Sequence, residues 1–201
     1  MNDSFHIAID YQKGVPDVIL SDFEKSISSE GLLFKSKCRE PEIFMSMEWA
    51  VPSIIVAYLS KPYFESFLKE AGKDHYQLVK KGFICLFGHI FGEKPETREV
   101  CRSQLFSIVT KLHDDRTAKF VFPEGVNTRE YEKSLDSLYE LVSSHYNSYP
   151  NDELSHLIEA LSTPSNIVYI EYCPEEKNWI LLDPFVEAHK LRKEQERKKL
   201  K

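Results

Sequence analysis

Glycine is scarce in this chain, with seven in 201 residues, and none stands in a recognisable phosphate-binding loop. Neither G-x-x-x-x-G-K-[ST] nor G-x-G-x-x-G occurs. Ala71-Gly72-Lys73-Asp74 has a similar composition, but it falls inside a helical pattern, where the amide hydrogens are already bonded. The G-x-S-x-G elbow of serine hydrolases is also missing. We therefore predict no cofactor and assign no catalytic residue.

Cysteine is equally sparse: the four cysteines are scattered and form no C-x-x-C pair. The seven histidines are dispersed as well, without the spacing of zinc ligands. We therefore assign no metal-binding residue. The first ten residues, MNDSFHIAID, lack the basic and apolar regions of a signal peptide. These features predict reduced thiols and a cytoplasmic protein.

The sequence has no apolar run long enough to cross a bilayer, which takes about 20 residues. The uncharged stretch 49–60 has twelve residues, with Glu48 before it and Pro52 within it. We interpret it as a buried helix rather than a membrane span. A second, amphipathic helix is expected to start after Ser60 and to run to about Ile90, with Gly72 marking a bend or a close approach.

The remaining periodicity alternates between strands and helices. We predict strands at 5–11 and 32–38 around a helix that starts near Asp17, a hairpin over 105–122, and a last hairpin over 166–183. Asn127 and Glu130 form a capping box that opens another helix, and a shorter helix follows Pro150. These elements predict a single α+β domain over 1–189, with a mixed or antiparallel sheet packed against a long helical pair.

Charge is distributed unevenly. Residues 190–201 (KLRKEQERKKLK) carry seven Lys or Arg and two Glu, a net of +5, so the formal charge of -6 leaves -11 on the rest. An acidic body disfavours nucleic-acid binding except through this tail. We expect the tail to be exposed and marginally helical, and to contact an acidic partner, a membrane surface or RNA.

Two clusters of polar residues are candidates for chemistry. His113-Asp114-Asp115 is better explained as the turn of a hairpin, because adjacent side chains point apart and Asp favours turns. Glu171 and Lys177 lack the spacing of a nuclease pair and the converging carboxylates that hold a metal. Cys–His catalysis has no local signature, although such partners can meet in the fold.

Tryptophans and the basic tail are the candidate contacts for a partner, because aromatic and Arg side chains dominate interface hot spots. The alternative for the aromatic residues is burial in the core. The predicted partner-binding residues are Trp49, Trp179, Lys190, Arg192, Lys193, Arg197, Lys198 and Lys199.

The segment EAGKDHYQLVKK (70–81), after the apolar stretch with Trp49 and Pro52, resembles part of small accessory domains of bacterial conflict or phage-defence proteins. The resemblance covers about residues 48–82. It implies an interaction or sensing module in a bacterial cytoplasm. Because catalytic motifs are missing, we predict a non-catalytic interaction or regulatory module, whose partner is another protein or a second copy of this chain. The alternative is a small hydrolase or metal-dependent nuclease whose site residues converge only in the fold.

Overall fold

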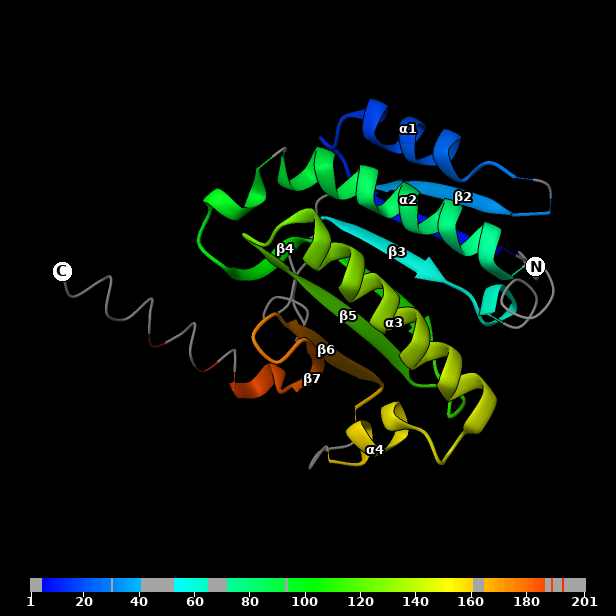
Figure 1. Cartoon of the computed structure of the whole chain (residues 1–201), viewed down its shortest axis with the longest axis vertical. Helices are drawn as coiled ribbons and strands as arrows, with labels where there is room; N and C mark the ends of the chain where they lie inside the picture. The colour runs from blue at the N-terminus through cyan, green and yellow to red at the C-terminus, as the bar shows by residue number, and fades with distance from the viewer. Residues whose placement is uncertain are drawn as a thin grey trace.

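Seven strands lie in one mixed sheet within the part of the chain that the computed structural model describes, residues 5–29, 31–40, 53–64, 72–92, 94–160, 165–186, 189 and 193 (Figure 1). The strands are β1 (Ile7–Gln12), β2 (Phe34–Arg39), β3 (Ile55–Leu59), β4 (Cys101–Lys111), β5 (Thr117–Glu124), β6 (Ile167–Cys173) and β7 (Asn178–Leu182). Their order in the sheet is β2-β1-β3-β4-β5-β6-β7.

The sheet consists of three β-α-β units and a final strand. The parallel pairs β1–β2, β3–β4 and β5–β6 are each joined across one face by helices: α1 (Asp17–Ile27), α2 (Gly72–Phe91), and α3 (Thr128–Ser148) with α4 (Glu153–Glu159). Neighbouring units run antiparallel, with Ile9 opposite Ala57 and Ile108 opposite Phe120. A short 3₁₀ helix, η3 (Pro95–Thr97), precedes β4. This arrangement is α+β, as predicted.

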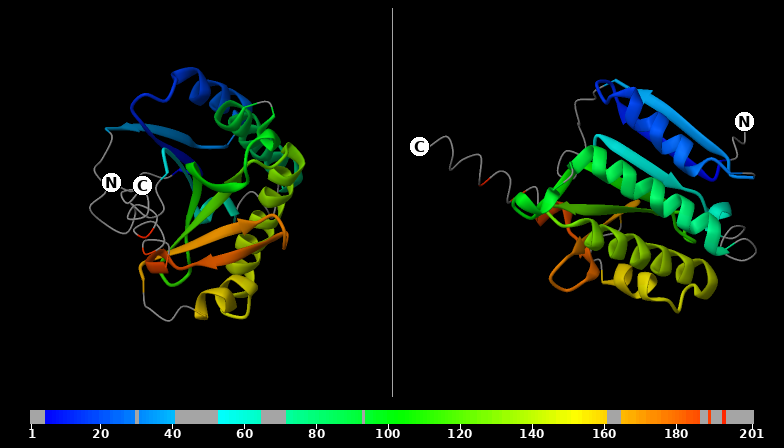
Figure 2. Two further views of the ribbon diagram at one scale, coloured as in Figure 1. Left: turned by 90° about the vertical axis from the view of Figure 1, so that its left-hand side faces the viewer. Right: turned by 45° about the horizontal axis from the view of Figure 1, so that its top comes forward.

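Helices α1, α2 and α3 lie side by side over the same face of the sheet (Figures 1 and 2). Beneath them is an aromatic core centred on Phe87, whose ring lies 5.0 Å from Phe106, 5.2 Å from Phe122 and 5.0 Å from Tyr131. Each partner comes from a different element, so Phe87 joins α2 to β4, β5 and α3. Rings in these tilted and edge-on arrangements contribute beyond the area that they bury.

The local signals at 127–130 and at both hairpins are confirmed. The Asn127 side chain accepts a hydrogen bond of 3.0 Å from the Glu130 amide and begins α3. Strands β4 and β5 pair antiparallel around the turn that holds Asp114 and Asp115, and Asp115 has a positive φ of 65° there. Strands β6 and β7 form the last hairpin. These features depend on short-range chemistry, which the sequence carries directly.

The prediction of a buried helix over 49–60 is wrong, because Ile55–Leu59 is a strand. Strand β3 lies between β1 and β4, and four of its five residues are buried. A strand covered on both faces is apolar throughout, so it loses the alternation that would distinguish it from a buried helix. Residues 41–52 lie outside the described part of the chain, as do 65–71, so α2 is described from Gly72.

Among the described residues, no helix has the length and apolar character needed to cross a membrane.

Candidate functional site

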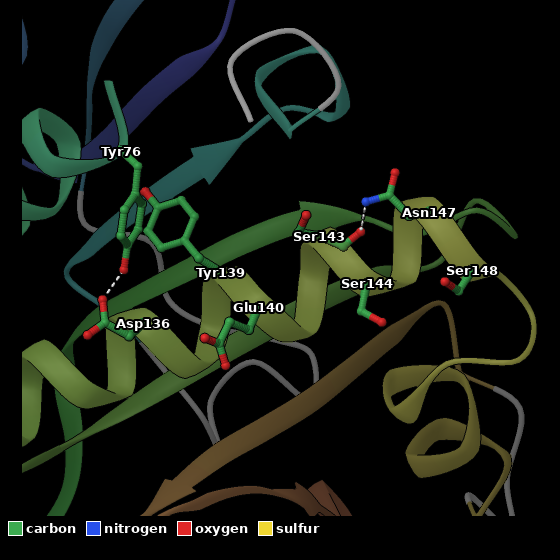
Figure 3. A pocket seen from close by; sticks show the side chains of 8 residues that line it. All are labelled: Tyr76, Asp136, Tyr139, Glu140, Ser143, Ser144, Asn147 and Ser148. Atoms are coloured by element: carbon green, nitrogen blue, oxygen red, sulfur yellow. Dashed lines mark hydrogen bonds between the residues drawn. The ribbon is translucent and has the colours of Figure 1, made fainter. Parts of the chain in front are cut away.

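A groove runs along the outward side of α3, next to the start of α2 (Figure 3). Its volume is about 640 Å³, and it is open to solvent. Helix α3 supplies nearly the whole surface of the groove, with seven of the eight lining residues. The lining residues are Tyr76 from α2 and Asp136, Tyr139, Glu140, Ser143, Ser144, Asn147 and Ser148 from α3.

The groove follows from the amphipathic pattern of α3. Leu135, Leu138 and Val142 point into the core and are fully buried, whereas Glu140 and Ser144, four residues apart, lie together on the exposed side. Because α2 and α3 run antiparallel, the end of α2 meets the start of α3 and the start of α2 meets its middle. Tyr76 consequently reaches Tyr139, with ring centroids 4.5 Å apart.

One end of the groove is a hydrogen-bonded group from both helices. The Tyr76 hydroxyl donates to Asp136 Oδ1, and Lys80 Nζ lies 2.8 Å from each Asp136 oxygen. Burial raises the pKa of Tyr76, and the hydrogen bond to Asp136 and its charge raise it further. Burial likewise raises the pKa of Tyr63 to about 12 and that of Tyr139 well above its ordinary value. These phenols therefore stay protonated at neutral pH and do not act as bases.

A second cluster, His145, Asp152 and Ser155, lies at the corner between α3 and α4. All three residues are buried. His145 Nε2 accepts from the His113 amide at 3.2 Å, so Nδ1 carries the hydrogen and donates to the Asp152 oxygens at 3.1 and 3.2 Å. Asp152 also accepts from the Ser155 hydroxyl at 2.6 Å and from the Ser155 amide at 3.0 Å, which caps α4.

This cluster has the residue types of a catalytic triad but the wrong geometry. In a triad the serine donates to His Nε2 while the aspartate accepts from Nδ1. Here the Ser155 hydroxyl lies on the Asp152 side, 3.3 Å from Nδ1, and a backbone amide occupies Nε2. Every polar atom of the imidazole is used to hold the β4–β5 turn and α4 to the end of α3. This group of three residues, named the His145 cluster below, therefore holds neighbouring elements together and is not arranged as a reaction centre.

The other candidate residues do not gather at one place. The prediction that Trp179 contacts a partner is corrected by its burial. Trp179 is 3% exposed and packs edge-on against Phe120 and Phe122, so it lies in the core and presents no surface. Lys193 is exposed, as predicted. The other partner-binding candidates lie outside the described residues: Trp49, Lys190, Arg192, Arg197, Lys198 and Lys199.

The polar residues considered for chemistry are accounted for by local structure. Asp114 accepts from its neighbour Arg116, with Oδ2 2.7 Å from Nε, inside the hairpin turn. Glu171 pairs with Arg102 at 2.6 Å on the sheet face opposite the helices, while Lys177 lies in the β6–β7 turn with a positive φ of 53°. Over the described ranges, no three His, Cys, Asp or Glu side chains are grouped to hold a metal ion.

Neither the α3 groove nor the His145 cluster was predicted from the sequence. Tyr76 and Asp136 are 60 residues apart, and no pattern in the sequence links them. One residue of the His145 cluster could have been assigned from the sequence. Asp152 follows Pro150 and precedes the apolar helix of Leu154 and Ile158, which is the pattern of an N-cap.

Comparison with known proteins identifies no family for this α+β domain. No protein-family model, curated protein or solved structure matches the chain.

Proposed function

We propose that the chain is a non-catalytic protein-interaction module and that the α3 groove holds a segment of its partner. The observation that carries this proposal is the composition of the groove: two Tyr, three Ser, one Asn and two carboxylates, all but Tyr76 from one side of α3. Tyr supplies rigid, amphipathic contact area, and Ser and Asn supply adaptable hydrogen bonds, which is the mixture typical of protein-recognition surfaces.

Rigidity supports the same function. Tyr139 is buried, and the Tyr76 ring is held both by Tyr139 and by its hydrogen bond to Asp136 (Figure 3). A surface whose side chains are already ordered loses less conformational entropy on binding than a mobile one.

The charge of the groove favours a basic partner segment. Asp136 and Glu140 both line it, and Glu140 is exposed. Lys80 neutralises Asp136 from the α2 side, which leaves Glu140 as the carboxylate available to an incoming Lys or Arg. An Arg that binds Glu140 while its stem packs on the Tyr76 ring would be a hot-spot contact.

The alternative function, a small hydrolase or metal-dependent nuclease, has less support. The converging His, Asp and Ser side chains are engaged in structural hydrogen bonds, and the phenols beside the groove stay protonated. We retain a bacterial cytoplasm and a regulatory role in a defence system as parts of the proposal. The bacterial origin and the defence role derive from the resemblance of residues 48–82, and the cytoplasmic location derives also from the scattered cysteines; all three remain predictions.

Site-directed photo-crosslinking in the cells that make the protein tests the proposal. A photoreactive phenylalanine analogue replaces Ser144 in the groove or, as the control, Glu24, which is exposed on α1. We expect a discrete adduct from position 144 only, and we expect Glu140→Arg to abolish it by repelling the basic segment. An absence of adducts at 144, or the same adducts at both positions, would contradict the proposal.

A further inference from the structure

The chain leaves the last strand through a helical turn that presents two large apolar side chains to solvent. Asp183 Oδ1 accepts from the amides of Phe185 at 2.8 Å and Val186 at 3.4 Å, which starts the turn. Phe185 is 58% exposed and Val186 is 50% exposed. The other large apolar side chains exposed in the described residues, Val18, Leu33, Val100 and Tyr149, are separate from one another in the sequence.

Basic residues follow this turn in the sequence. Of the residues after Val186, the structure describes His189 and Lys193, and both are helical and exposed. The sequence from 190 to 201 has a net charge of +5. The exposed apolar pair is thus followed, after Glu187, Ala188 and His189, by a concentrated positive charge in the sequence.

We infer that this C-terminal segment binds the surface of an anionic membrane. Phe185 and Val186 would enter the boundary between head groups and acyl chains, Lys193 would contact lipid phosphates, and the net charge of 190–201 would attract the anionic surface. Aromatic and aliphatic side chains combined with Lys and Arg are the chemistry of interfacial binding, and neither component is sufficient by itself.

Charge also sets the character of this binding. The remaining residues have a net charge of -11, which the same membrane repels. The association should therefore be reversible and sensitive to salt, with the domain held away from the lipid. RNA or an acidic protein would engage the cations, but neither gives the adjacent apolar pair a role, and for this reason we favour a lipid surface.

Sedimentation of the full-length protein with vesicles tests the inference. We expect binding to vesicles of phosphatidylcholine and phosphatidylserine in equal parts, little binding to phosphatidylcholine alone, and weaker binding in high salt. Each basic residue at the surface contributes roughly a fivefold increase in binding, so Lys193→Glu should reduce it by more than about fivefold.

The apolar pair is tested by the double variant Phe185→Ser, Val186→Ser, which should bind the anionic vesicles at least about tenfold more weakly. Val18→Ser is the matched control, because Val18 is 56% exposed on α1, and it should bind as the wild type does. Equal binding to both vesicle types, no binding to either, or full binding by the double variant would overturn the inference. Tighter binding to a single-stranded oligoribonucleotide than to the anionic vesicles would also overturn it, in favour of nucleic acid. Glu140→Arg should leave vesicle binding intact, which separates this inference from the proposed function.

Discussion

Two glycines of α2 should respond in opposite directions to the same substitution. Gly82 is buried against α1, and a Cβ placed there would lie 2.5 Å from Ile27 Cγ2 and 2.9 Å from Ser26 Oγ. Gly88, six residues later on the same helix, is exposed and has no atom within 4 Å of such a Cβ. Both lie in the helix and neither has a positive φ, so packing is the difference between them.

The magnitudes follow from two competing effects. Alanine is favoured over glycine inside a helix by about 1 kcal/mol. At Gly88 this gain is unopposed, so Gly88→Ala should stabilise the protein by about 0.5–1 kcal/mol. At Gly82 the added methyl group meets Ile27, which is fully buried, and overpacking of this kind costs about 1–3 kcal/mol. The net change for Gly82→Ala should be a loss of about 0–2 kcal/mol, the overpacking cost less the gain of about 1 kcal/mol from the helix preference of alanine.

Urea unfolding followed by circular dichroism measures both variants under the same conditions. The difference between them should equal the overpacking cost of about 1–3 kcal/mol, or about 2–12 °C in Tm for a chain of this size. In an Ile27→Ala background the cost of Gly82→Ala should shrink, because the clashing methyl group is gone. If Gly82→Ala is as stable as Gly88→Ala, or if its cost is unchanged without Ile27, the close approach of α1 and α2 is refuted.

Three further predictions concern the His145 cluster and the basic segment 190–201. Asp152→Ala should cost about 3 kcal/mol, since it removes an N-cap and leaves His145 and Ser155 without their acceptor. Asn127→Ala, which removes a cap on the surface, should cost about 1 kcal/mol. Equal costs in thermal unfolding would show that the His145 cluster does not stabilise the fold. Burial acts to raise the pKa of Asp152, but hydrogen bonds from Ser155 and His145 outweigh it and hold that pKa below 3.8. The pKa of Asp152 is lower in the folded chain than in the unfolded chain, so the stabilisation is complete above about pH 4 and is lost as the pH falls through the folded pKa. Asp152→Ala should therefore lose less stability than the wild type between neutral pH and about pH 3. Deletion of 190–201 should leave Tm almost unchanged, because the segment has only two apolar residues to bury, and a loss of several degrees would show that it packs on the acidic domain.

Much of the local structure was legible in the sequence because the responsible groups are a few residues apart. Asn127 caps α3 within one turn, Asp114 and Asp115 make the hairpin turn, and the apolar spacing of Leu135, Leu138 and Val142 marks the buried side of a helix. The amphipathic character that defines the α3 groove was therefore available in part. The α+β class followed from the same signals, since hairpins and long helices alternate along the chain.

Tertiary structure alone decided what depends on covering and on long-range pairing. Residues 55–59 become a strand because β1 and β4 supply hydrogen bonds on both edges, and a segment that is apolar throughout carries no period to announce this. Trp179 is buried because Phe120 and Phe122, more than fifty residues away, pack against its ring. His145 becomes a structural residue when the hairpin turn brings the His113 amide to its Nε2. In each case the deciding partner is distant in sequence, and only the folded chain brings the two together.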